Sequence, residues 1–278
     1  MNNMNDRIMV RANKKEELFG ELVYTNLLNY AIDNCNLSAK LNKTKISDVV
    51  PLESMNQFII YKKNEFNPDE HITDLRDLKI LRDKLLSIDK ETPSKLDDEE
   101  GLYTLQSLSS LIKITEFLYT KSKISHNNRC QILKEVATIV ALDYALGMGS
   151  RHSSDILFAK SDITGKYRYL NVNNNFTLLD DETSFKLISN NYRHTKYENE
   201  LLAFANRLNY SPYLDYFQNS YIELVNKLKE SVVEDAVYDA IKMMPSEYRD
   251  VRIYDFLLKY QDQRINKLER SKRLDIYR

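Results

Sequence analysis

Residues 142–158, LDYALGMGSRHSSDILF, join the end of an apolar segment to a short β-rich run. The loop between them, at residues 147–155, holds two glycines, a histidine and an aspartate. Upstream, residues 136–146 contain one charged residue, Asp143. A segment that is apolar on nearly every side predicts a buried helix, which we place at residues 128–146.

A β-hairpin is predicted after this loop. Its strands are residues 156–159 and 167–172, and residues 162–165, Asp-Ile-Thr-Gly, form a turn with glycine in the last place. Three asparagines, at 173–175, end the second strand. The order is therefore buried helix, glycine-containing loop, hairpin and polar triplet.

The N-terminal part predicts a small mixed sheet packed on one helix. Residues 7–12, 46–50 and 58–61 are β-rich, and residues 14–34 carry an apolar stripe with glutamates in their first half. Further helices are predicted at residues 74–88, 102–121 and 198–273, the last with breaks near 211–212 and 244–245. The segment 89–101, with Pro93 and an acidic run, predicts a solvated loop and a domain boundary.

Composition narrows the class of protein. Forty basic residues face 41 acidic ones, so bulk charge gives no argument for nucleic acid or an anionic membrane. Two cysteines, Cys35 and Cys130, argue against a disulfide framework or a thiolate zinc site. They favour a reducing cytoplasm. The longest apolar stretch, residues 136–148, is too short to span a bilayer, and residues 1–11 lack a signal-peptide core.

The loop at residues 146–158 resembles the catalytic loop of the HipA-like serine/threonine kinases and the phosphatidylinositol kinases. Their pattern is an apolar helix, Leu-Ile-Gly, two residues, Asp-Arg-His, two residues, Asn and an apolar strand, with a hairpin leading to a metal-binding Asp. The resemblance implies an α+β, predominantly helical, two-lobed kinase-like fold. The reduced N-lobe would span residues 1–95 and the large helical C-lobe residues 96–278, with a catalytic-loop-like segment at 146–180.

The resemblance also implies ATP and Mg²⁺ as cofactors and a set of site residues. These are Ser150 and His152 as catalytic, Arg11 and Glu21 as nucleotide-binding, and Asp155, Asn174 and Asn173 as metal-binding residues. Arg11 stands where the family has a strand lysine on the nucleotide phosphates, and Glu21 is the helix residue that pairs with it. We expect Arg11, Asp155 and Asn174 to share one pocket.

Three departures from the family pattern bear on activity. Ser150 replaces the catalytic aspartate, and a serine hydroxyl is no general base near neutral pH, a loss that costs about 10²–10⁴ in rate. Asp155 and Asn174 have exchanged residue types relative to the family. The first strands and the phosphate-covering glycine loop are missing. We therefore favour a pseudokinase or binding scaffold; the alternatives are a divergent active kinase and a helical interaction protein unrelated to kinases.

Each candidate also has a simpler interpretation. His152 suits a hydrogen-bonded structural histidine, residues 173–175 suit a turn, and Arg11 with Glu21 suits a salt bridge without nucleotide. The basic segment 259–278 could bind nucleic acid, although an exposed helix with a solvated face is the favoured interpretation. We expect another protein as partner and no membrane association.

Overall fold

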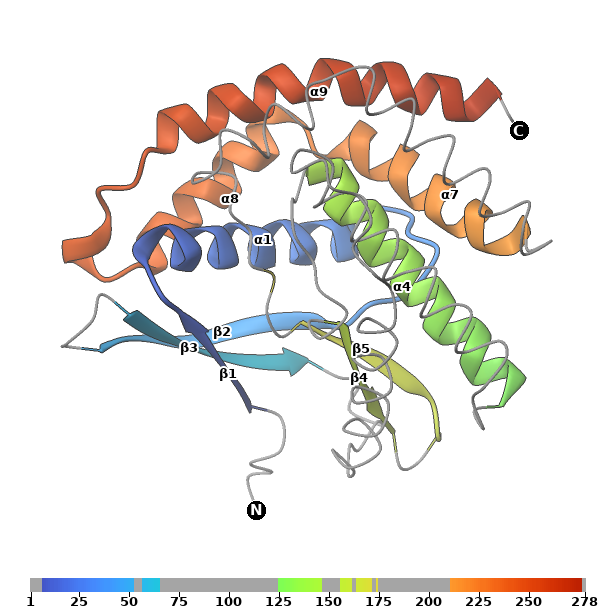
Figure 1. Ribbon diagram of the computed structural model, residues 1–278, viewed down its shortest axis with the longest axis horizontal. Coiled ribbons are helices and arrows are strands. Elements are labelled where there is room, and N and C mark those ends of the chain that lie inside the picture. Colours follow the sequence, from blue (N-terminus) through green and yellow to red (C-terminus); the bar gives the residue numbers. More distant parts are fainter. Residues whose placement is uncertain are drawn as a thin grey trace, which may run out of the picture.

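The computed structural model describes residues 7–52, 57–65, 125–146, 156–161, 164–171, 174 and 211–276 (Figure 1). Its elements are β1 (Arg7–Ala12), α1 (Lys15–Asn34), β2 (Lys43–Leu52), β3 (Gln57–Glu65), α4 (His126–Leu146), β4 (Ile156–Lys160), β5 (Tyr167–Asn171), α7 (Ser211–Lys227), α8 (Glu230–Met243), the 3₁₀ helix η3 (Ser246–Tyr248) and α9 (Ile253–Ile276). Helices predominate in this part of the chain, which agrees with the predicted α+β, mostly helical class.

The first three strands form one sheet in the order β1-β3-β2. Both strand pairs are antiparallel, so the prediction of a mixed sheet is wrong. β3 is central, and its burial alternates along the strand, with Phe58, Ile60, Lys62 and Asn64 buried. Because side chains of a strand alternate between faces, these four residues share the inner face of the sheet.

Helix α1 lies over the inner face of this sheet, with α8 and then α9 stacked beyond it (Figure 1). Just before the N-cap residue Lys14, the Asn13 backbone N–H donates to the Glu17 carboxylate of the first turn at 2.7 Å. Phe19 packs edge-on against Phe256 of α9, with ring centroids 5.7 Å apart. Phe58 of β3 makes a similar contact with Tyr248 of η3 at 4.8 Å. The N-terminal elements and the C-terminal helices therefore share one core.

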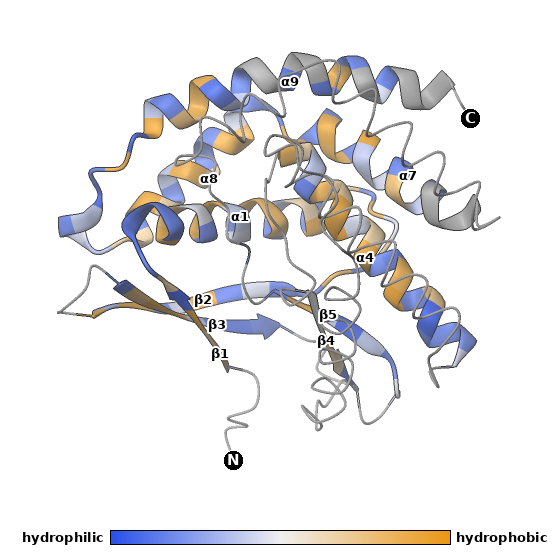
Figure 2. Ribbon diagram, in the orientation of Figure 1, coloured by the Kyte–Doolittle hydropathy of each residue, from blue (hydrophilic) through white to orange (hydrophobic). Residues whose placement is uncertain are grey.

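Helix α4 packs along α7, and the β4–β5 hairpin lies beside it (Figure 1). Figure 2 shows α4 hydrophilic at its first turn and mostly hydrophobic beyond it, as expected for the buried central helix. In the hairpin, β4 and β5 pair antiparallel, and Gly165 has a φ of +63°. That left-handed conformation agrees with the glycine expected in the last place of the predicted turn, whose residues 162 and 163 lie outside the described residues.

The C-terminal segment has more breaks than predicted. The predicted interruption near 244–245 corresponds to the end of α8 at Met243, and a further break separates α7 from α8. The break predicted near 211–212 adjoins residues outside the described ranges. The helices predicted at 74–88 and 102–121, and the domain boundary near residue 95, lie outside the described residues. No helix in the described ranges has both the length and the apolar character needed to cross a membrane.

Candidate functional site

Glu21 lies in the second turn of α1, on the side that faces the sheet. Its neighbours at helical spacing, Leu18, Thr25 and Leu28, are all buried, and Glu21 itself is only 2% exposed. A carboxylate removed from water is costly unless it is paired and hydrogen-bonded. The contacts around Glu21 therefore decide what this position does.

The cation that pairs with Glu21 is Lys62, on the inner face of β3. The Lys62 ammonium donates to Oε1 of Glu21, and the two side chains are 0% and 3% exposed. Both charges are thus withdrawn from solvent, and each compensates the other.

Asn174, which follows β5, completes the pairing of Glu21. Its backbone N–H donates to Oε2 at 2.8 Å, and its side-chain Nδ2 donates to Oε1 at 2.6 Å. Nδ2 also donates to Oδ1 of Asn171, at 2.7 Å. We call Glu21, Lys62, Asn171 and Asn174 the Glu21 cluster. It joins α1, the three-stranded sheet and the end of the β4–β5 hairpin in one buried set of hydrogen bonds.

The polar network continues from the Glu21 cluster to Asn64. Oδ1 of Asn64 accepts from the Asn171 backbone N–H at 3.2 Å and from the Thr44 hydroxyl at 2.9 Å. These bonds set the amide orientation, because a flipped Asn64 would turn Nδ2 toward the Asn171 N–H, a donor against a donor. Nδ2 of Asn64 is then a buried donor with no partner within the described ranges. A buried unsatisfied donor of this kind calls for a functional or solvent explanation.

Arg11 does not belong to the Glu21 cluster. It is exposed, pairs in register with Ile59, and donates to the side chain of Gln57. Lys62 instead pairs in register with Ile8, on the inner face. Arg11 therefore lies on the opposite face of the sheet from Glu21, and the expected convergence of Arg11 with Asn174 does not occur.

Lys62 was missed because the strand was predicted to end at residue 61. The strand extends to Glu65, and its side chains alternate between the two faces, so that Lys62 takes one of the inward positions. The sequence contained this information, because Lys62 follows Phe58 and Ile60 at a spacing of two residues and so faces the same side of a strand. A lysine in phase with the apolar face of a strand, together with a glutamate in phase with the apolar face of a helix, predicts a buried ion pair.

The remaining predicted site residues fall in two groups. Ser150, His152, Asp155 and Asn173 lie outside the described residues. Of the other three, Glu21 and Asn174 are in direct contact and Arg11 is remote from them. In the basic C-terminal helix, Lys267 faces inward, with Nζ 5.1 Å from the centroid of the Tyr260 ring, and it is 2% exposed.

Two further buried carboxylates hold α4 in place. Asp143 accepts from the Tyr24 hydroxyl of α1 at 2.7 Å. Glu135 accepts from Gln131 at 2.6 Å, from the Tyr169 backbone N–H at 2.5 Å and from Arg168 at 3.3 Å. Burial nevertheless raises the pKa of Glu135 to about 7, because desolvation outweighs these partners. Both carboxylates position the helix from which the predicted catalytic loop continues.

Comparison with models of known protein families gives no match, and comparison with curated proteins gives none either. Among solved structures, the chain is similar to the Helicobacter pylori proinflammatory kinase CtkA. The two share 12% sequence identity with a TM-score of 0.43, over 93% of this chain and 82% of that one. A TM-score below 0.5 does not establish a shared fold, so the contacts of the Glu21 cluster carry the functional case.

Proposed function

We propose that this chain is a kinase-like protein that binds ATP with Mg²⁺ and has little phosphoryl-transfer activity, acting as a pseudokinase or binding scaffold. The observation that carries the proposal is the buried ion pair between Lys62 and Glu21. In protein kinases a strand lysine paired with a helix glutamate holds the nucleotide phosphates. The same chemical pair stands here between a central strand and the helix that covers it.

Stability alone is a weak reason for such a pair. Removing two charges from water costs several kcal/mol each, and well-packed apolar residues in their place are often as stable or more so. The surrounding residues on the inner face, Phe58 and Ile60, show that this face readily accommodates apolar side chains. The charged pair is therefore better explained by a ligand-binding role than by packing.

The lysine stands on a different strand from that of the kinase pattern, but its side chain can reach the same space. In the family the lysine lies on the strand before the helix, which here is β1 and presents Ile8, Val10 and Ala12 inward. Lys62 lies directly across from Ile8. Because opposed residues of antiparallel strands have Cβ atoms about 4.5–5.5 Å apart, a lysine on β3 can reach the space that a lysine on β1 would reach.

The described residues suit the phosphates of a nucleotide. Lys62 supplies a cation, and Asn64, two residues further along the same face, supplies the unsatisfied Nδ2 donor. The two positions are about 6.6 Å apart along the strand. Phosphate oxygens accept charge-assisted hydrogen bonds from such groups.

The Mg²⁺ ligands are less complete. Asn174 is the one predicted metal ligand among the described residues, and its Nδ2 is committed to Glu21 and Asn171. Within the described ranges no three carboxylate, histidine or cysteine side chains gather as a metal site. In the proposed function the metal is held by Asp155 with Asn174 or Asn173, and it would neutralise phosphate charge. Ser150 in place of the catalytic aspartate accounts for the low transfer activity.

Thermal denaturation with and without ATP and Mg²⁺ tests the binding step. At a ligand concentration of one hundred times the dissociation constant, we expect a stabilisation of about 2.7 kcal/mol. The stabilisation should be lost in the double variant Lys62→Met with Glu21→Gln, which removes the cation without leaving a buried lone carboxylate. Lys63→Met, an exposed neighbour on the same strand, is the matched control and should respond like the wild type. If the melting temperature of the wild type does not change at millimolar nucleotide, the chain does not bind ATP, and a scaffold without nucleotide is the proposal that remains.

Transfer of radiolabelled phosphate from ATP separates the pseudokinase from a divergent active kinase. We expect no labelling of the chain or of added protein substrates above background. Labelling that disappears in Asp155→Ala would instead establish the active alternative, because that variant removes the predicted metal carboxylate. Neither assay depends on knowing the physiological substrate.

A further inference from the structure

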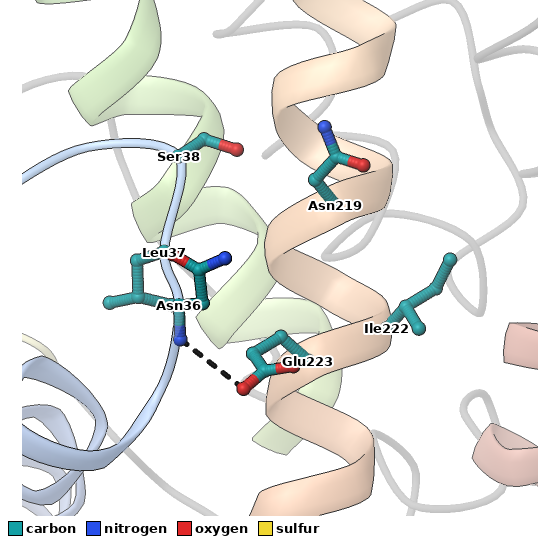
Figure 3. Close-up of a pocket in the computed structure, with 6 residues that line it drawn as sticks. All are labelled: Asn36, Leu37, Ser38, Asn219, Ile222 and Glu223. Atoms are coloured by element: carbon teal, nitrogen blue, oxygen red, sulfur yellow. Dashed lines mark hydrogen bonds between the residues drawn. The ribbon is translucent and has the colours of Figure 1, made fainter.

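A pocket separate from the Glu21 cluster lies between α7 and the segment that connects α1 to β2 (Figure 3). Its volume is about 420 Å³. Six residues line it: Asn36, Leu37, Ser38, Asn219, Ile222 and Glu223. This volume lies within the range of roughly 300–1,000 Å³ that small-ligand sites occupy.

Hydrogen bonds fix the two walls of the pocket against each other. The Asn36 backbone N–H donates to Oε1 of Glu223 at 3.2 Å, the contact drawn in Figure 3. The Ser38 backbone N–H donates to the Ser220 hydroxyl at 3.1 Å, and the Ser38 hydroxyl donates to the Tyr216 carbonyl at 2.8 Å. The connecting segment is therefore anchored to α7 at both ends of the lining, and the pocket is preformed.

Glu223 is the one charged residue among those that line the pocket. It forms no ion pair in the described part of the chain, although Lys227, exposed, follows it one helical turn later. The carboxylate accepts one neutral hydrogen bond, from Asn36. A carboxylate with two oxygens and about four lone-pair sites has capacity for a further charged donor.

The rest of the lining suits a long side chain with a polar end. Asn36 and Asn219 are both exposed, and the side-chain amide oxygen of each can accept a hydrogen bond from a ligand. Leu37 and Ile222 add apolar surface. An alkyl stem can lie against the apolar residues while a cationic head reaches the carboxylate and the amide oxygens.

We propose that this pocket binds an alkylguanidinium group, the side chain of arginine. A guanidinium presents five donors in a planar fork that matches a carboxylate in a bidentate contact, with donors left over for the amide oxygens of Asn36 and Asn219. An ammonium is a compact point charge and satisfies fewer of these acceptors at once. The ligand comes either as a free small molecule or as an arginine of a protein partner. This inference does not rest on nucleotide binding.

Titration calorimetry of the whole chain tests the pocket with three probes: agmatine, a short peptide with a central arginine, and the same peptide with citrulline in that place. Citrulline keeps the shape of arginine and removes its charge. We expect the arginine peptide to bind at least tenfold more tightly than the citrulline peptide. Agmatine that binds as well as the arginine peptide points to a free small molecule, and binding of the peptide alone points to a protein partner.

Glu223→Gln is the decisive variant, since it preserves shape and removes the charge. It should weaken binding of the arginine probe about tenfold or more, whereas Glu234→Gln on α8, a partly buried glutamate outside the pocket, should leave it unchanged. Asn219→Leu, at an exposed position on the pocket wall, should weaken binding without involving the carboxylate. The proposal is overturned if no guanidinium probe binds at millimolar concentration, or if Glu223→Gln binds the arginine peptide as the wild type does.

Discussion

Replacing Lys62 with methionine should destabilise the protein strongly, although methionine is itself a good core residue. The substitution keeps a long unbranched side chain on the inner face of β3 and removes only the charge. Glu21, 2% exposed, would then retain the two donors of Asn174 and no counterion. The predicted instability thus comes from the carboxylate left behind, not from a cavity.

The magnitude follows from the burial of both partners. Removing one member of a buried ion pair typically costs about 3–5 kcal/mol. A domain of ordinary stability has roughly 5–15 kcal/mol in total, so Lys62→Met should remove a large fraction of it. Glu21→Gln should cost a similar amount, because it leaves the ammonium without its carboxylate. The double variant should be more stable than either single variant, since the amide oxygen introduced at position 21 can still accept from Asn174 and no lone charge is buried.

Urea denaturation measures this series directly. The chain has no tryptophan and 19 tyrosines, so far-ultraviolet circular dichroism and tyrosine fluorescence are the two probes. The midpoints should move while the denaturant slope stays constant, which indicates a change in stability alone. Lys63→Met is the control, exposed on the same strand, and should change the free energy of unfolding by less than about 0.5 kcal/mol.

Two results would refute this reasoning. A Lys62→Met variant within about 1 kcal/mol of the wild type would mean that Glu21 is not left buried and unpaired. A double variant whose loss equals the sum of the two single losses would mean that the two charges are energetically independent. In either case the ion pair could not be the basis of a nucleotide site.

Three further predictions concern the buried carboxylates of α4 and the turn of the β4–β5 hairpin. Because the pKa of Glu135 is raised from 4.5 to about 7, the folded state holds a proton that the unfolded state releases; stability should therefore fall as pH rises from about 4.5 to 7, by on the order of 3 kcal/mol. Glu135→Gln should abolish this slope in urea melts taken across that pH range. Tyr24→Phe removes the buried hydrogen bond to Asp143 and should cost about 1–3 kcal/mol, whereas Tyr30→Phe on the same helix should cost under about 0.5, both measured by chemical denaturation. Gly165→Ala should cost about 1 kcal/mol in thermal unfolding through its φ of +63° alone, because an added Cβ meets no atom within 4 Å; an unchanged melting temperature would contradict the turn conformation.

Elements with strong local signals were predicted well. The first strand, the central helix and the hairpin turn each depend on patterns within a few residues, such as alternation, a continuous apolar run or a glycine after a polar turn. Boundaries were less certain: β2 and β3 extend beyond their predicted runs because polar residues join the ladder once a neighbouring strand is present. That extension carried Lys62 into the sheet.

The sequence also left open which side of the sheet each residue faces. Arg11 and Lys62 are both cations on short β-rich runs, and the order of the family pattern, with the lysine strand directly before the helix, favoured Arg11. Which alternate residues of a strand face the core decides which cation meets Glu21, since a shift of one residue moves a side chain to the opposite face. The register of β1 against β3 places Lys62 inward with Ile8 and Arg11 outward with Ile59.

The sequence by itself determined the class of the chain, the buried central helix, the hairpin behind it and the glutamate within an apolar helix. Only the tertiary structure decided which cation meets that glutamate, and that Asn174 reaches it from a segment 153 residues away. Local periodicity follows from backbone geometry, which each segment carries within itself. The pairing of buried charges depends on which distant segments exclude water together, and no single segment contains that information.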